Sequence, residues 1–158
     1  MLLAGPISAA SLSPRDLRIL ASALAFVQPP PGGVVAIVHA GRDNASRRDA
    51  DAILSAIGEN LAAGGITLTP KLVDAEELNS IGFSLVIVAA GANSETVLQA
   101  VRAHHALCVT ADQAAVRQGL CTMAIHASLK VDILLNYRAA LASGLRIATA
   151  FRMMVGEL

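Results

Sequence analysis

The sequence predicts one α/β domain, a three-layer sandwich in which a mostly parallel sheet of five to six strands carries helices on both faces. Two patterns support this prediction. Short apolar segments alternate with amphipathic helical segments, as in βαβ units. Near the C-terminus, two strand-like segments are separated only by a short turn, which predicts a C-terminal β-hairpin at the sheet edge. The 158 residues suffice for one domain with a sizeable core.

Six segments have strand character. Residues 34–39 are short and mostly apolar, as in strands buried on both faces, and residues 84–90 give the strongest such signal. Pro70 predicts that its strand lies at an edge or ends there. The remaining predicted strands are residues 66–73, 107–110, 121–126 and 129–135, the last two forming the hairpin around Ala127 and Ser128.

Capping residues mark the predicted helices. Ser13 and Pro14 predict the N-cap and first residue of a helix that reaches about Val27. Ser46 and Asp49 predict a capping box for a longer helix, which we expect to end at residues 64–65. Shorter helices are predicted after residues 74 and 94 and at residues 112–118, 137–143 and 146–155.

The segment from residue 129 to 145 contains residues that typically begin and end secondary-structure elements. Strand alternation places Val131 and Leu135 on the core face. Asn136 is a suitable N-cap for the helix that follows. Gly144 can adopt the left-handed conformation that ends a helix, with Leu145 as its hydrophobic partner. The pattern predicts a sharp strand-to-helix corner, and by itself it indicates no chemistry.

Composition excludes several function classes. The net charge is zero and no stretch is strongly basic, which argues against nucleic acid as the main partner. With three Phe, one Tyr and no Trp, the chain also lacks the aromatic platforms on which bases stack. No apolar run reaches the roughly 18 residues that a membrane-spanning helix needs, so we expect a protein that does not itself span a membrane.

The first charged residue of the chain is Arg15. Residues 1–13 are therefore interpreted as a leader or as the remnant of a signal peptide, although a positive n-region is missing. We expect the single domain to comprise residues 14–158. Both readings of the leader remain open at this point.

Residues 108–154 resemble the C-terminal half of the YfiR-like family of small periplasmic proteins. The family pattern is a strand, a helix, a Gly-Gly turn, a hairpin whose second strand ends in Ile-Asn, a short helix, Gly-Leu and a final helix. Leu120 replaces the second Gly of the turn, and Leu135 replaces the Ile before Asn, so the chain resembles a divergent member. The matching residues are Val109, Thr110, Asp112, Gly119, Val131, Asn136, Ala139, Ala140, Gly144, Leu145 and Ile147.

The resemblance implies regulation rather than catalysis. Such proteins are expected in the periplasm, where they bind the periplasmic sensor domain of a membrane-bound diguanylate cyclase and hold the enzyme inactive. Release of the cyclase then raises cyclic-di-GMP. The resemblance further implies a homodimer, no cofactor and no catalytic residue.

Two other functions remain as alternatives. The first is a periplasmic solute-binding protein of the ABC-transporter type, which would use the crevice beyond the carboxyl ends of the strands. The second is a cytoplasmic nucleotide-binding enzyme, which the missing phosphate-binding motifs disfavour. An anion is a candidate ligand because a helix begins directly after the strand at residues 34–39. The candidate crevice residues are His39, Arg42, Asn44, Asn93, Ser94 and Thr110.

The cysteines and histidines provide few further candidates for functional residues. Cys108 and Cys121 are candidates for a disulfide in an oxidising compartment, and the alternative is a pair of buried thiols. His104 and His105 are adjacent, so on a helix they point about 100° apart and rarely bind one metal ion together. We therefore expect no metal site.

Overall fold

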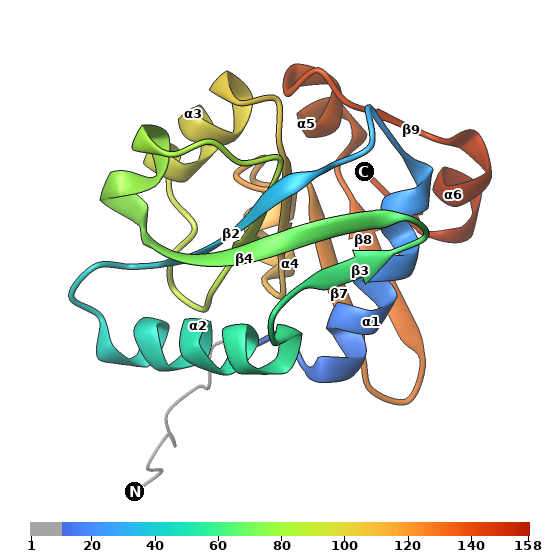
Figure 1. Cartoon of the computed structure of the whole chain (residues 1–158). Coiled ribbons are helices and arrows are strands. Elements are labelled where there is room, and N and C mark those ends of the chain that lie inside the picture. The colour runs from blue at the N-terminus through green and yellow to red at the C-terminus, as the bar shows by residue number, and fades with distance from the viewer. Residues whose placement is uncertain (1–10) are drawn as a thin grey trace, which may run out of the picture.

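The computed structural model describes residues 11–158 and shows an α/β sandwich built around an eight-stranded sheet (Figure 1). The strand order across the sheet is β10-β8-β7-β6-β5-β2-β4-β3. The five strands from β7 to β4 run parallel, β3 is antiparallel to β4, and β8 is antiparallel to β7 but parallel to β10. The strands are β2 (Gly33–His39), β3 (Leu61–Ala63), β4 (Ile66–Asp74), β5 (Leu85–Val88), β6 (Leu107–Thr110), β7 (Met123–Ala127), β8 (Val131–Leu135) and β10 (Gly156–Glu157).

Helices cover both faces of this sheet and complete the three layers. One face packs against α1 (Pro14–Ala23), α2 (Asn44–Ile57) and α6 (Thr149–Met154). The other face packs against the 3₁₀ helix η2 (Ala75–Ser80), α3 (Glu95–Ala103) and α4 (Gln113–Arg117). The remaining elements are the 3₁₀ helix η1 (Leu24–Phe26), β1 (Val27–Gln28), α5 (Tyr137–Ala142) and β9 (Arg146–Ile147), with β1 and β9 pairing antiparallel.

The central strands are buried on both faces, which explains their uninterrupted apolar sequences. In β2, Val35 and Ile37 belong to the core beside α1 and α2, whereas Ala36 and Val38 belong to the core beside α3. The same alternation holds in β5, β6 and β7. Because both faces need cover, the connections between these parallel strands are helical.

The predicted fold class is confirmed, and the sheet has more strands than the five to six expected. The additional strands β3 and β10, and the separate β1–β9 pair, contain only two or three residues each. Segments that short carry no measurable periodicity in the sequence. Pro70 lies in the middle of β4, beyond the residues that β3 covers, so the strand forms the sheet edge at that point, as the sequence indicates.

The prediction for the helix after β2 was wrong at both ends. Asp43, not Ser46, caps α2, and its carboxylate accepts hydrogen bonds from the backbone N–H groups of Ala45 and Ser46. The hydroxyl of Ser46 instead accepts a hydrogen bond from the N–H of Ala40. The helix ends at Ile57, and residues 64–65 form the turn of the β3–β4 hairpin.

Two details of the C-terminal prediction also need correction. Val131 was expected on the buried face, but 49% of its surface is exposed because it lies next to the hairpin turn. The hairpin turn is residues 128–130, so Ala127 belongs to β7. The helix predicted at residues 146–155 is shorter, because residues 146–147 form β9 and pair with β1.

The first turn of α1 ties the N-terminus of the helix to the hairpin. Ser13 caps α1, and Asp16 completes the capping box by accepting a hydrogen bond from the N–H of Ser13. The second carboxylate oxygen of Asp16 accepts from the N–H of Ala127 at 2.8 Å, so this buried charge has two backbone donors. Of the predicted leader, residues 1–10 lie outside the described residues, whereas Leu12 is buried in the core.

The corner between β8 and α5 forms as the sequence predicts. The side-chain oxygen of Asn136 accepts a hydrogen bond from the N–H of Ala139, and its side-chain nitrogen donates to the carbonyl of Val116 at the end of α4. Gly144 follows α5 with a φ of +77°. The N–H of Leu145 reaches back to the carbonyl of Ala140, which together with the bond from Gly144 to Leu141 is a Schellman motif.

We predict that Asn136→Ala lowers the free energy of unfolding by about 2 kcal/mol, because the variant loses a helix cap and leaves the carbonyl of Val116 without its donor. Urea denaturation measures the change. Asn44→Ala is the matched control, since Asn44 is exposed in the first turn of α2 and surface changes usually cost less than about 0.5 kcal/mol. Equal effects of the two variants would contradict the prediction.

Candidate functional site

Three helices end in the same way at one end of the molecule. α3, α4 and α5 are each followed by a residue with positive φ, namely His105 (+52°), Gly119 (+79°) and Gly144 (+77°). After each, the next N–H bonds back to a carbonyl in the last turn of the helix. The three are therefore Schellman motifs, which allow the chain to leave each helix sharply. Helices that follow parallel strands run back toward the strand N-termini, so the ends of α3 and α4 lie at the amino ends of those strands.

His105 links two of these helix ends. Its Nδ1 lies 3.2 Å from the carbonyl oxygen of Ser143, and a Cβ on Gly144 would come within 2.9 Å of the same nitrogen. His104 points elsewhere, because its ring packs against Phe83 with centroids 4.4 Å apart. The two adjacent histidines thus serve different contacts, and His105 holds the end of α3 against the end of α5.

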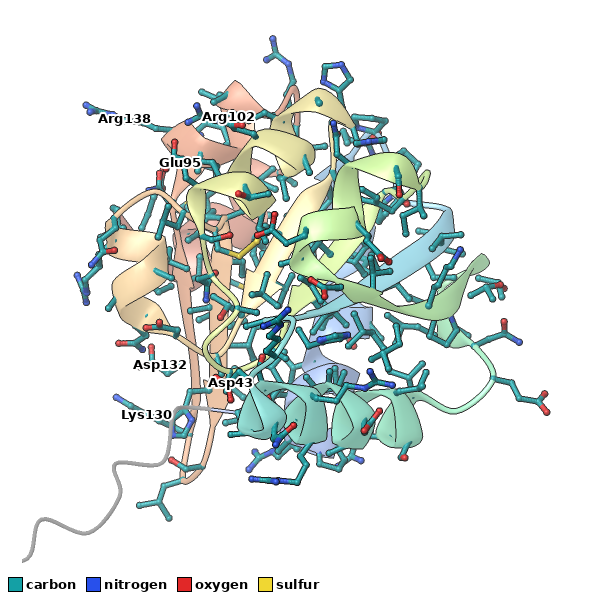
Figure 2. All side chains as sticks on the ribbon, turned by 90° about the vertical axis from the view of Figure 1, so that its left-hand side faces the viewer. Asp43, Glu95, Arg102, Lys130, Asp132 and Arg138 are labelled. Carbon is teal, nitrogen blue, oxygen red and sulfur yellow. A yellow bond between two sulfur atoms is a disulfide. The ribbon has the colours of Figure 1, made fainter. Side chains whose placement is uncertain are left out.

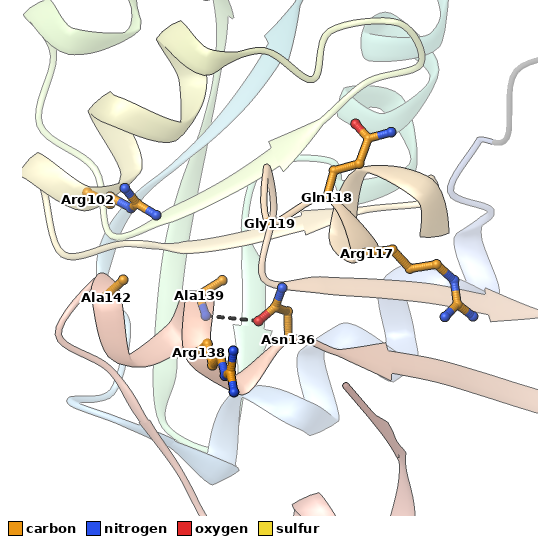
Figure 3. A pocket seen from close by; sticks show the side chains of 8 residues that line it. All are labelled: Arg102, Arg117, Gln118, Gly119, Asn136, Arg138, Ala139 and Ala142. Carbon is orange, nitrogen blue, oxygen red and sulfur yellow. Dashed lines mark hydrogen bonds between the residues drawn. The ribbon is translucent and has the colours of Figure 1, made fainter.

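A pocket of about 370 Å³ opens between these helix ends, and it is lined by three arginines. Arg102 lies in the last turn of α3, Arg117 in the last turn of α4 and Arg138 in the first turn of α5. Figure 3 shows their side chains around Asn136. We call this cavity the arginine pocket, and its other lining residues are Gln118, Gly119, Ala139 and Ala142.

The arginine pocket carries positive charge that the described residues do not neutralise. Within residues 11–158, the ion pairs join Arg47 to Asp51 and Arg152 to Glu157, so none involves a lining arginine. Arg102 and Arg117 are at helix C-termini, where cations are favourable. Arg138 is at a helix N-terminus, where a cation is unfavourable. Helix stability therefore does not explain the position of Arg138.

Of the residues matched to the YfiR-like pattern, Gly119, Asn136 and Ala139 line this pocket, and Asp112 holds the neighbouring helix. Asp112 caps α4 by accepting from the N–H groups of Ala114 and Ala115. Gly119 leaves room beside Asn136, whose Nδ2 lies 4.0 Å from the position of a Cβ there. Asn136 then joins α4 to α5, as described above. These residues thus have structural roles, and the arginines between them provide the charge.

A disulfide joins Cys108 of β6 to Cys121, directly after the chain leaves α4 (Figure 2). The Cα atoms are 5.1 Å apart, and both residues are buried among the side chains that pack under α3 and α4. The bond closes a loop that contains all of α4. It therefore fixes the helix that carries Arg117 against the sheet.

The predicted crevice lies at the opposite ends of the parallel strands. There β2 lies between β4 and β5. The chain therefore continues from β2 toward one edge of the sheet and returns through β5 toward the other, so the strand order reverses at β2. His39 is buried, and within residues 11–158 its Nδ1 has no hydrogen-bond partner. Asn93 donates to the hydroxyl of Thr110 at 3.1 Å, while its Oδ1 has no partner within that range. Ser94 caps α3 by accepting from Val97.

The protein itself fills the position expected for an anion. The carboxylate of Asp43 accepts hydrogen bonds from two backbone N–H groups at the start of α2. It also lies against Gly91 in the loop after β5. Arg42 and Asn44 are exposed on either side of Asp43. The five pockets described for this chain are lined by none of the candidate crevice residues. This arrangement argues against anion binding at that helix end.

Sequence reasoning did not single out the arginine pocket. Its three arginines are separated by 15 and 21 positions along the chain, with no motif of their own. The available signal was local, since Arg117 precedes Gly119 by two residues and Arg138 follows Asn136 by two. An arginine in the first turn of a predicted helix departs from the charge preference of helix ends, but Arg15 shows the same departure in α1, so this signal alone does not identify the pocket.

Comparison of the sequence with models of known protein families gives no match, and comparison with curated proteins gives none either. Among residues 11–158, no helix is both long and apolar enough to cross a membrane. In the same range, no group of three or more His, Cys, Asp or Glu side chains is placed to hold a metal ion.

We predict that removing the disulfide with Cys108→Ala and Cys121→Ala lowers the free energy of unfolding by about 3 kcal/mol, because the unfolded chain regains the freedom of a loop of this length. Urea denaturation of the oxidised protein and the double variant tests this. Reduced wild-type protein is the control for lost packing, because it keeps both sulfur atoms. An unchanged midpoint after reduction would show that the bond contributes no stability.

Proposed function

We propose that this chain is a YfiR-like regulatory protein that acts outside the cytoplasm. It binds the periplasmic domain of a membrane-bound sensor, such as a diguanylate cyclase, and holds that sensor inactive. The arginine pocket is the surface that binds the sensor, and its ligand is an acidic segment. The proposal combines the sequence resemblance with the charge of this pocket, and it assigns no catalytic residue.

This proposal rests on the position of Arg138. Its charge opposes the dipole of α5, and none of the described carboxylates pairs with it. Guanidinium groups bind carboxylates through two parallel hydrogen bonds, so an arginine is suited to an acidic partner. Arg102, Arg117 and Arg138 are all exposed, which lets an extended segment reach them without entering a closed cavity.

The disulfide supports a location outside the cytoplasm. Disulfides persist in oxidising compartments such as the periplasm and are rare in the reducing cytoplasm. In this chain the bonded cysteines are the only two, and both are buried beneath α3 and α4. The bond therefore supports the shape of the arginine pocket as well as the proposed compartment.

Inhibition follows from a difference in affinity. A protein that binds the inactive state of the sensor more tightly than the active state shifts the sensor toward inactivity. A complete shift from 1:99 to 99:1 needs about a 10⁴-fold difference in affinity. Release of this protein from the sensor restores activity, and for a diguanylate cyclase the readout is cyclic-di-GMP.

The size of the arginine pocket favours a second candidate, a solute-binding protein for small anions. Its volume of about 370 Å³ falls within the range of small-molecule sites. In this reading a carboxylate or phosphate group of the solute pairs with the arginines. Residues 11–158 form one lobe, and the pocket lies open at its surface, which makes this function the weaker proposal.

We predict that deletion of the gene raises cellular cyclic-di-GMP and that the wild-type gene reverses the rise. Complementation with Arg138→Glu should leave the level high, because the substituted carboxylate repels an acidic partner. Arg48→Glu makes the same charge change at an exposed position on α2 and should complement fully.

The outcomes separate the two candidates. An unchanged cyclic-di-GMP level in the deletion strain would reject regulation of a diguanylate cyclase. Thermal stabilisation of the purified wild-type protein by citrate or inorganic phosphate, absent in Arg138→Glu, would then favour solute binding. Equal complementation by the two charge variants would show that the arginine pocket does not bind the sensor.

A further inference from the structure

The turn between β7 and β8 protrudes from the molecule (Figure 1). β7 runs parallel to β6, so this turn, at residues 128–130, lies beyond the carboxyl ends of the parallel strands. β10 pairs with Leu134 and Leu135 at the other end of β8, so within residues 11–158 the first half of β8 has no strand on its outer side. We call residues 128–131 the hairpin tip, and it is a convex, uncovered part of the surface.

Apolar side chains are exposed at the hairpin tip. Leu129 is fully exposed, and Val131 is half exposed. The apolar surface continues to Met154 of α6, which is 69% exposed and lines a pocket of about 200 Å³ together with Val131. Exposed apolar side chains that are scattered singly are ordinary, whereas these three follow one another along one edge of the molecule.

Two cations flank the exposed leucine. Lys130 follows it directly and is exposed, and Arg15 of α1 donates to the carbonyl of Ser128 at 2.9 Å. Neither takes part in the ion pairs found within residues 11–158. The nearest carboxylate along β8, that of Asp132, accepts a hydrogen bond from Gln113 of α4. The hairpin tip therefore combines an apolar side chain with unneutralised positive charge.

We propose that the hairpin tip binds the surface of an anionic phospholipid bilayer. Leu129 enters the boundary of the lipid chains, while Lys130 and Arg15 contact lipid phosphates. Peripheral binding of this kind combines burial of apolar area with electrostatic attraction to anionic lipids. The inference does not depend on the proposed function.

The shape and charge of the hairpin tip favour a bilayer over a protein partner. A protein that buries a protruding leucine needs a pocket of matching shape, because protein interfaces are closely packed. Lipid chains adapt to the side chain that enters them. The phosphates of one bilayer surface also complement two cations that come from separate elements, the hairpin and α1.

The hairpin tip is held in place before it meets lipid. Besides the bond from Arg15, the carboxylate of Asp16 accepts from the N–H of Ala127 at 2.8 Å, so two bonds join the first turn of α1 to the hairpin. A guanidinium carries five N–H donors, so the bond to Ser128 leaves others for a phosphate. Such preorganisation lowers the cost of binding.

Binding through the hairpin tip leaves the arginine pocket away from the lipid. The tip lies at the carboxyl ends of the parallel strands, whereas the arginine pocket lies at their amino ends. Figure 2 shows Lys130 at the opposite end of the molecule from Arg102 and Arg138. The two surfaces can therefore be tested separately, and failure of one proposal leaves the other standing.

Vesicle cosedimentation of the full-length oxidised protein tests the proposal. The wild type should bind vesicles of equal parts phosphatidylglycerol and phosphatidylcholine, and more weakly in high salt. Leu129→Asp should weaken this binding by about tenfold or more, because a carboxylate is excluded from lipid chains and repelled by phosphates. Leu141→Asp makes the same change at an exposed position on α5 and should match the wild type. Both variants retain residues 1–10, so any contribution of that segment is the same in both.

Charge reversal tests the electrostatic part of the binding. Lys130→Glu should weaken binding to the same vesicles by about tenfold and reduce its dependence on salt. Lys71→Glu changes the net charge equally at an exposed position on β4 and should have no such effect.

Fluorescence identifies the inserted residue. The chain contains no Trp, so Leu129→Trp introduces a single reporter. Its emission should shift to shorter wavelength when the vesicles are added, and brominated lipid chains should quench it, because the indole leaves water. Leu141→Trp should show neither effect.

Four results would overturn the proposal. They are a wild type that does not bind the anionic vesicles, equal binding by Leu129→Asp and Leu141→Asp, equal binding by Lys130→Glu and Lys71→Glu, and a Leu129→Trp variant whose emission the vesicles leave unchanged. The first result would point to a protein partner at the hairpin tip instead.

Discussion

Burial of the parallel strands on both faces is the constraint on which the rest of this structure depends. Because β2, β5, β6 and β7 bury side chains against helices above and below, their faces hold no room for a binding site. Polar and charged groups are left to the strand ends and the free edge. The crevice beside His39, the arginine pocket and the β8 edge all lie in those places, and they differ in what already fills them.

At the carboxyl ends of the strands, the protein fills the space itself. Asp43 occupies the helix N–H groups that would bind an anion, and Asn93 bonds to Thr110. At the amino ends the arrangement is open. The Schellman motifs turn the chain sharply after each helix, the side chain of Asn136 bridges α4 and α5, and three arginines remain without carboxylate partners among the described residues.

β8 connects the arginine pocket to the partly covered edge of the sheet. Asn136, at the rim of the arginine pocket, directly follows its last residue, whereas Val131 begins the strand at the free edge. Five residues of β-strand span about 17 Å. The exposed start of β8 at Val131 is therefore well separated from the arginine pocket.

By itself, the sequence determined the fold class, the central strands and most helix caps, because apolar periodicity and capping chemistry act over a few neighbouring residues. For that reason, the sequence alone predicted that Asn136 begins a helix and that Gly144 ends it. Only the tertiary structure decided where Arg102, Arg117 and Arg138 meet, since three separate connections bring them together. It also decided that Val131 is exposed and that β10 covers only half of β8, because strands of two residues leave no pattern in the sequence.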